Sequence, residues 1–242
     1  MTTVRVWWAS LGGALLDERP LDPVERSRAA AFRREDDRRR FVLGALMVRH
    51  ALGRDLGVPP AEVPVDRRCA TCGGPHGPPR SPGSRLRLSV THAGDAVGVA
   101  AALDLPVGVD VEPLAGLDDA RTLAADALTR AELSRLTGPS RLDEAVFVRG
   151  FAERWVAKEA ILKATGDGLR LPMAGLELGG DRAPYRLVGW AERPDVVRRV
   201  SLHRLDGAPA GHVACLAVLG GDSRPEVEEL PAADLLAPRV GA

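Results

Sequence analysis

The sequence predicts an α+β fold in which one chain forms two similar subdomains. Residues 40–49 align without gaps to residues 154–163, and both segments carry apolar residues at helical spacing. Each segment is followed, after a long loop, by an apolar strand rich in small residues, at 97–103 and at 213–219. Two amphipathic helices can agree by chance, but a duplicated unit predicts an intramolecular pseudo-dimer with its active site in the cleft between the halves.

The remaining patterns place helices and strands in both halves. Helix-start and helix-stop residues predict helices at 23–34, 36–56, 118–127, 130–136 and 143–165. Apolar runs bounded by turn residues predict strands at 4–9, 86–90, 96–103, 107–111, 176–178, 185–190, 197–204 and 212–219. We therefore expect an N-terminal subdomain over 1–104, a C-terminal subdomain over 105–222, and a loosely held polar tail over 223–242.

Composition limits the functional class. Of the 242 residues, 45% are hydrophobic, which is typical of a globular protein and argues against disorder. No apolar run approaches the roughly 20 residues that span a bilayer, and the first ten residues lack the pattern of a signal peptide. We therefore expect a cytoplasmic protein with no membrane partner. The 33 basic residues balance the 33 acidic ones, so no overall positive charge favours nucleic-acid binding.

Two carboxylates lie close together in the predicted strand at 107–111 and just after it. Asp110 and Glu112 are two positions apart, so their side chains point to the same face while Val109 and Val111 face a core. Neighbouring carboxylates repel each other unless a cation lies between them, and oxygen ligands suit magnesium. By itself the pattern also fits a solvated acidic edge of a strand.

A carboxylate and an ammonium group follow on the predicted helix at 143–165. Glu159 and Lys163 are four positions apart, so they share one face of the helix. Glu159 could supply a further metal ligand or a base, and Lys163 could contact a phosphate. An ordinary surface ion pair, worth about 0.3–0.5 kcal/mol, has the same spacing.

Together the two motifs resemble the Sfp-type 4′-phosphopantetheinyl transferases of the holo-acyl-carrier-protein synthase superfamily. That family has a G-[IV]-D-[IV]-E segment followed by a W-x-x-K-E-[AS]-x-x-K helix, and this chain carries both, at 108–112 and 155–163. Three further family segments, G-x-G-L-x-L-P, R-x-x-L-G and N-[IV]-S-H-[ST], resemble residues 166–172, 38–44 and 88–94. The resemblance covers residues 26–219, which is most of the chain.

The resemblance implies a role for each matching residue. Asp110, Glu112 and Glu159 match the acidic positions that bind Mg²⁺, and Glu159 also matches the favoured base for the carrier serine. The implied catalytic residues are Glu159, Lys163 and Asp110. The positions that match contacts to coenzyme A are Arg28, Arg40, Thr91, His92, Lys158 and Lys163. Thr91 replaces the usual serine and keeps the hydroxyl.

Two departures from the family pattern concern phosphate and adenine contacts. Glu25 stands where the family commonly has a basic residue, and residues 76–79 lack the lysine of a G-K-P loop. In the same loop Cys69, Cys72 and His76 have the spacing of metal ligands. Structural zinc usually takes four protein ligands, so both a zinc site and a tight Gly-Pro loop remain open at this position.

The resemblance implies Mg²⁺-dependent transfer of 4′-phosphopantetheine from coenzyme A to a serine of an acyl or peptidyl carrier protein, with release of 3′,5′-ADP. We expect a monomer, because a duplicated chain builds the cleft without a partner. The metal-binding residues would equally serve a magnesium-dependent hydrolase of a nucleotide pyrophosphate. The arginine-rich segment 33–40 would suit a non-enzymatic nucleic-acid-binding module, although the net charge argues against it.

Overall fold

The computed structural model describes residues 2–13, 16–69, 72–75, 77–138, 143–220 and 224–237. Its strands are β1 (Thr3–Ser10), β2 (Leu86–Ala93), β3 (Ala96–Leu103), β4 (Val107–Pro113), β5 (Leu176–Gly179), β6 (Arg186–Trp190), β7 (Val200–Leu205), β8 (His212–Leu219) and β9 (Glu226–Pro231). Its α-helices are α1 (Pro23–Ala30), α2 (Glu35–Leu56), α3 (Ala120–Ala127), α4 (Arg130–Thr137), α5 (Glu144–Thr165), α6 (Pro194–Val197) and α7 (Ala232–Leu236).

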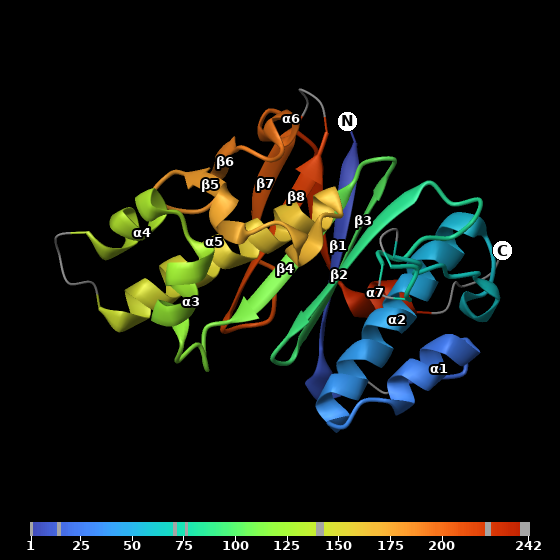
Figure 1. The fold of residues 1–242 in the computed structure, drawn as a ribbon. Coiled ribbons are helices and arrows are strands. Elements are labelled where there is room, and N and C mark those ends of the chain that lie inside the picture. The colour runs from blue at the N-terminus through green and yellow to red at the C-terminus, as the bar shows by residue number, and fades with distance from the viewer. Residues whose placement is uncertain are drawn as a thin grey trace.

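The two halves repeat one topology. In the N-terminal half β1, α2, β2 and β3 follow one another, and β3 lies between β1 and β2 with antiparallel pairing on both sides. In the C-terminal half β4, α5, β7 and β8 follow one another, and β8 lies between β4 and β7 in the same way. The β5–β6 hairpin is inserted after α5. The fold is therefore α+β with two similar halves, as predicted (Figure 1).

The core has three layers because alternate residues of each central strand face opposite sides. In β8, Ala214, Leu216 and Val218 pack between the two sheets, against Val4 and Val6 of β1. The intervening β8 side chains pack against α5, and the outer face of the N-terminal sheet packs against α2. A long helix thus covers the outer face of each sheet (Figure 1).

The two halves meet along β2 and β4. Their backbones do not form a ladder within the described part of the chain; instead, β2 hydroxyls accept β4 amide protons. Ser89 Oγ accepts from Val109 N at 3.1 Å, and Thr91 Oγ1 accepts from Val111 N at 3.2 Å. This seam brings the end of β2 beside Asp110.

Several predicted boundaries shift by a few residues. The first helix ends at Ala30 rather than at Arg34, because residues 31–34 form the corner that leads into α2. The strand predicted at 197–204 begins at Val200, because Pro194 starts the short helix α6. Across the described ranges, no helix combines the length and the apolar character needed to cross a membrane.

The expectation of a loosely held tail is wrong for residues 224–237. Strand β9 pairs in parallel with β1, and Leu235 of α7 lies in the core against α2. Glu229 accepts hydrogen bonds from Trp8 Nε1 at 2.8 Å and from the amides of Asp206 and Gly207. Glu229, one of the carboxylates that make the tail look solvated, is therefore a hydrogen-bond acceptor on an edge strand. In Figure 1 the red α7 lies beside the blue α2, so β9 and α7 belong to the N-terminal half.

Substitution Leu235→Ala is expected to lower the free energy of unfolding by about 2–5 kcal/mol, because the side chain is 0% exposed and its removal leaves a cavity against α2. Urea denaturation monitored by circular dichroism measures this loss. Val188→Ala is the matched control, since Val188 is 50% exposed and its truncation should cost less than about 0.5 kcal/mol. Equal stability of the two variants would contradict the packing of α7.

Candidate active site

A close approach of α5 to β4 sets the geometry of the acidic residues. A Cβ atom on Gly108 would lie 2.0 Å from the carbonyl oxygen of Ala160, so no larger residue fits there. Val109 and Val111 pack between the sheets, and the alternation therefore points Asp110 towards α5. The glycine of the predicted motif thus allows α5 to lie directly over Asp110.

Asp110 is a buried carboxylate held by two side chains from different elements. Its Oδ1 accepts from Lys163 Nζ at 2.7 Å and from Thr91 Oγ1 at 3.1 Å. Lys163 also donates to the carbonyl oxygen of Val109 at 3.1 Å. Asp110 Oδ2 is buried with no hydrogen-bond partner among the described residues. A buried carboxylate oxygen without a donor is costly, so this atom is available to a cation.

Glu112 and Glu159 share one electrostatic environment with Asp110. Burial raises the pKa of Glu112 to about 7, and the charges of Asp110 and Glu159 add to the shift, while Lys163 and a hydrogen bond from Trp155 oppose it. Burial also raises the pKa of Glu159, again with a contribution from Asp110 and opposition from Lys163. Three carboxylates therefore repel one another around a single ammonium group, which is an environment that favours binding of a cation.

The raised pKa of Glu112 predicts a pH-dependent stability for the metal-free protein. The folded state binds the proton more tightly than the unfolded state, whose pKa is near 4.5, so stability should fall as pH rises from about 4.5 to about 7. We expect the free energy of unfolding to drop between pH 5 and pH 8 by about 1–2 kcal/mol more in the wild type than in Glu112→Gln. Urea denaturation at both pH values in EDTA tests this, and parallel pH profiles would contradict it.

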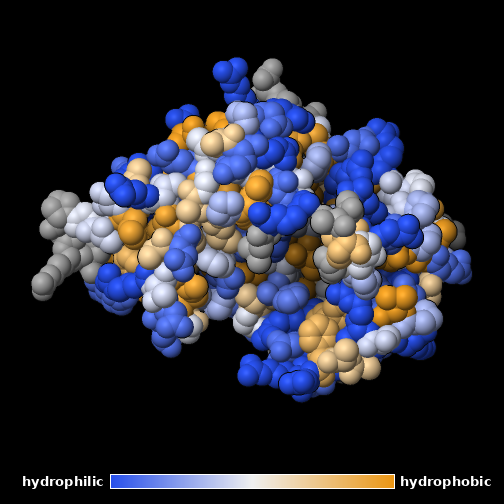
Figure 2. All heavy atoms as spheres, in the orientation of Figure 1, coloured by the Kyte–Doolittle hydropathy of each residue, from blue (hydrophilic) through white to orange (hydrophobic). Residues whose placement is uncertain are grey.

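A basic pocket of about 230 Å³ lies between the two halves and reaches Asp110 and Lys163. Its lining comes from α1, α2, β2, β4, α5 and the loop before β2: Arg28, Arg40, Phe41, Gly44, Ala45, Arg67, Val90, Thr91, His92, Asp110 and Lys163. In the space-filling view the surface is notched between the lobe that contains α3–α5 and the lobe that contains α1 and α2 (Figure 2). The structure thus brings five predicted residues from both halves to one pocket with Asp110.

The basic side chains of this pocket are anchored by local contacts. Arg40 donates to Asp37 at 2.6 Å and to the carbonyl oxygen of Gly94 at 2.5 Å. Arg28 donates to the carbonyl oxygen of Pro75 at 2.7 Å and stacks over Phe41. Partial burial lowers the pKa of His92, and Lys163 and Arg40 lower it further by repelling the positive form. These groups leave an electropositive pocket that suits a polyanion.

Arg67 is a pocket residue that the sequence analysis missed. Burial lowers the pKa of Arg67 to about 10, and its Nε has no hydrogen-bond partner among the described residues. A buried, unpaired guanidinium nitrogen beside Arg28 is a natural anion contact. In the sequence Arg67 stands in a Gly- and Pro-rich loop with no motif of its own. The backbones of Asp66 and Arg80 pair and close this loop. A local sequence pattern could not have predicted that pairing.

Lys158 does not reach the pocket, so its predicted contact to coenzyme A is wrong. Its side chain is fully buried on another face of α5 and forms an ion pair with Glu132 at 2.6 Å. The remaining donors go to the carbonyl oxygens of Ala127 and Met173. Neighbouring residues on a helix point about 100° apart, so Lys158 and Glu159 face different surroundings.

Glu25 is a structural residue, which explains its departure from the family pattern. It forms a capping box with Asp22 at the start of α1 and accepts a hydrogen bond from the buried Arg49 at 2.5 Å. Of the candidate zinc ligands, Cys69 is half-buried, Cys72 is exposed, and His76 lies outside the described residues. Among the residues that the structure describes, no group of three or more His, Cys, Asp or Glu side chains is arranged to bind a metal ion.

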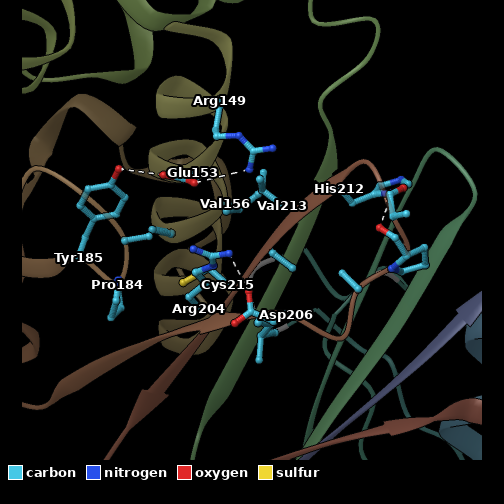
Figure 3. Close-up of a pocket in the computed structure, with 17 residues that line it drawn as sticks. Arg149, Glu153, Val156, Pro184, Tyr185, Arg204, Asp206, His212, Val213 and Cys215 are labelled. Atoms are coloured by element: carbon cyan, nitrogen blue, oxygen red, sulfur yellow. Dashed lines mark hydrogen bonds and ion pairs between the residues drawn. The ribbon is translucent and has the colours of Figure 1, made fainter. Parts of the chain in front are cut away.

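A second pocket, of about 220 Å³, lies against a different face of α5 (Figure 3). Arg149 and Glu153 of α5, Tyr185, Arg204 and Cys215 line it, and it contains no predicted site residue. Glu153 accepts from Tyr185 at 3.4 Å and lies 4.0 Å from Arg149, and burial raises the pKa of Cys215 to about 12. The thiol is therefore protonated at neutral pH, and the charges of Glu153 and Arg149 lie next to each other.

Comparison with known proteins relates the chain to one family. Residues 106–215 match the model of the 4′-phosphopantetheinyl transferase superfamily. The chain is 33% identical over 150 residues to a 4′-phosphopantetheinyl transferase of Nostoc sp., a match that covers 62% of this chain and 61% of the relative. It is 30% identical to a 4′-phosphopantetheinyl transferase of Bacillus pumilus over 74% of this chain and 72% of the relative. A holo-ACP synthase structure from Plasmodium yoelii aligns with a TM-score of 0.37 and 21% identity, over 49% of this chain and 95% of that one.

Proposed function

The chain belongs to the 4′-phosphopantetheinyl transferase superfamily, and from that premise we propose that it transfers 4′-phosphopantetheine from coenzyme A to a serine of an acyl or peptidyl carrier protein. The serine oxygen forms a bond to the phosphorus that bears the pantetheine. The bond from that phosphorus to the bridging oxygen of the pyrophosphate breaks, and 3′,5′-ADP leaves with the electron pair. The serine proton passes to a base of the enzyme.

The observation that carries the proposal is the meeting of an acidic cluster and a basic pocket between the two halves. Asp110, Glu112 and Glu159 affect one another electrostatically, and Asp110 and Lys163 also line the basic pocket. A pyrophosphate in this pocket would lie beside carboxylates, which requires a cation between them. The acidic cluster beside the basic pocket therefore supports a magnesium-dependent reaction of a nucleotide pyrophosphate.

The carboxylates fit magnesium by their chemistry. All three offer only oxygen ligands, the unpartnered Asp110 Oδ2 is buried, and the mutual repulsion falls when a cation binds. Asp110, Glu112 and Glu159 would bind the ion, which would offset charge on the pyrophosphate. Because Lys163 occupies Asp110 Oδ1, the three carboxylates form no ready-made metal cage in the described residues.

We assign the remaining roles by position. Arg28, Arg40 and His92 line the pocket and would bind the phosphates of coenzyme A. Glu159 is the proposed proton acceptor, since a raised pKa brings a carboxylate closer to the range of a general base. Thr91 would orient Asp110, because its hydroxyl already donates to that carboxylate. Both halves of the pocket come from one chain, so we propose a monomer as the working form.

Mass spectrometry of an apo carrier protein incubated with the chain, coenzyme A and Mg²⁺ tests the proposal. We expect the carrier to gain the mass of one phosphopantetheine, and the gain to disappear in EDTA. Breakdown of coenzyme A without modification of several unrelated carriers would instead show a pyrophosphate hydrolase. No product from coenzyme A would overturn the proposed function.

Lys163→Met is expected to bind Mn²⁺ more tightly than the wild type in the absence of coenzyme A, by about threefold or more, because the ammonium group at 2.7 Å competes for Asp110. Electron paramagnetic resonance of free Mn²⁺ measures the affinity. Arg204→Met is the control, since it also removes one positive charge. Arg204 pairs with Asp206 at the second pocket, away from Asp110. Weaker Mn²⁺ binding in Lys163→Met would contradict the competition.

A further inference from the structure

A fully buried ion pair lies directly beside the proposed active-site helix face. Lys158 of α5 and Glu132 of α4 are both 0% exposed, and their Nζ and Oε2 atoms are 2.6 Å apart. Lys158 and Lys163 are the only lysines in the sequence. Lys158 immediately precedes Glu159, so whatever fixes Lys158 also restrains the backbone that carries Glu159.

Hydrogen bonds of the pair join α3, α4, α5, β5 and the segment that follows α5. Lys158 Nζ donates to Glu132, to Ala127 O at the end of α3 at 2.9 Å, and to Met173 O after α5 at 3.1 Å. Glu132 also accepts from Thr129 N at 2.7 Å through Oε2 and from Leu178 N of β5 at 2.9 Å through Oε1. The three ammonium protons are all engaged, and both carboxylate oxygens have partners.

The Lys158–Glu132 ion pair is a buried polar connection between α5 and the α3–α4 layer. The ion pair Arg121–Glu144, which also joins α3 to α5, has both side chains about 60% exposed, and exposed pairs restrain geometry weakly. On the other side, α5 contacts β4 at Gly108 and through Lys163, which donates to Asp110 and to the carbonyl oxygen of Val109. The rotation of α5 about its axis therefore depends on apolar packing, on the bonds of Lys163 towards β4 and on the buried bonds of Lys158 towards the α3–α4 layer.

We propose that Glu132 is a positioning residue for the transfer reaction: through Lys158 it fixes the rotation and the axial position of α5, and thereby places Glu159 over Asp110. This inference rests on the proposed function. Glu132 itself touches neither Asp110 nor the basic pocket. Its capping box with Thr129 explains the start of α4, but not the bonds to Lys158 and Leu178.

The proposed role affects the turnover step more than the binding of coenzyme A. Arg28, Arg40 and His92 come from the N-terminal half and do not depend on α5 for their position. A displacement of a reacting group by about 1 Å can cost as much as 10²-fold in rate. We therefore expect Glu132→Gln to lower kcat by about 10- to 100-fold while the KM for coenzyme A stays within about twofold.

The experiment compares Glu132→Gln, Glu132→Asp and Thr129→Ala with the wild type, at a temperature where circular dichroism shows each variant folded. Glu132→Asp keeps the carboxylate and should recover part of kcat. Thr129→Ala removes the cap of α4 without touching Lys158, so it should lower stability but leave kcat unchanged. Mn²⁺ affinity is a second readout, which should fall with kcat because Glu159 is a proposed ligand.

If Glu132→Gln does not fold, the double variant Glu132→Gln/Lys158→Gln replaces the ion pair with two amides and leaves no unpaired buried charge. Unchanged kcat and Mn²⁺ affinity in the folded variant would overturn the positioning role. So would a loss of kcat that Thr129→Ala reproduces. If the wild-type chain modifies no carrier, the proposed function is wrong instead. The Mn²⁺ affinity of the variants would still test whether Glu132 places Glu159.

Discussion

Glu159→Gln is expected to lower the rate of carrier modification by about 10²–10⁴-fold while the chain stays folded. The amide cannot accept the serine proton and is a poorer ligand for magnesium. Burial and repulsion from Asp110 raise the pKa of the Glu159 carboxyl group, and a neutral amide avoids both costs, so the substitution should not weaken the fold. Mass spectrometry of the carrier over time measures the rate.

Glu153→Gln is the matched control for this experiment. Glu153 lies on the same helix, carries the same group, and lines the second pocket, where it contacts Tyr185 and Arg149 (Figure 3). The rate of carrier modification by Glu153→Gln should stay within about twofold of the wild-type rate, because Glu153 is half-buried in the second pocket and does not line the basic pocket. Equal losses in both variants, or full activity in Glu159→Gln, would refute the role of Glu159.

Lys158→Met is expected to lower the free energy of unfolding by about 3–5 kcal/mol. The methionine fills a similar volume, but Glu132 would remain buried with a negative charge and no counter-ion. The carbonyl oxygens of Ala127 and Met173 would each lose a donor as well. Urea denaturation at neutral pH measures the loss, which on this scale is a large fraction of the stability of a typical domain.

Arg121→Met provides the comparison for a solvent-exposed pair. Arg121 lies 2.6 Å from Glu144, and both side chains are well solvated, so breaking the pair should cost about 0–1 kcal/mol. If Lys158→Met loses no more unfolding free energy than Arg121→Met, then water or a local rearrangement must stabilise the buried charge of Glu132. That result would also remove the physical basis for its proposed effect on α5.

The acidic part of the candidate site could be predicted from local spacing. Asp110 and Glu112 face one side because strand residues alternate, and Glu159 and Lys163 share a helix face because they are four apart. In the structure Asp110 contacts Lys163, and all three carboxylates influence one another. The sequence also predicted the α+β class and the duplicated halves, since both follow from the order and periodicity of the elements.

The errors concern residues whose partners are distant in the chain. Lys158 belongs to a motif beside Glu159, yet Glu132, 26 positions earlier, decides where its charge lies. Arg67 has no motif and became a pocket residue only because its loop packs against α1. The tail looked polar, but Glu229 finds its donors in Trp8 and in the loop after β7.

Local sequence patterns were enough to identify most of the helices and strands, and to show which face each charged motif residue shares with its near neighbours. These properties depend on residues no more than about four positions apart, where backbone geometry is regular. Only the tertiary structure decided that Lys163 meets Asp110, that Lys158 is withdrawn into an ion pair, and that β9 returns to β1. Such pairings depend on how apolar faces pack over long chain separations, and a buried charge takes whichever partner that packing places within reach.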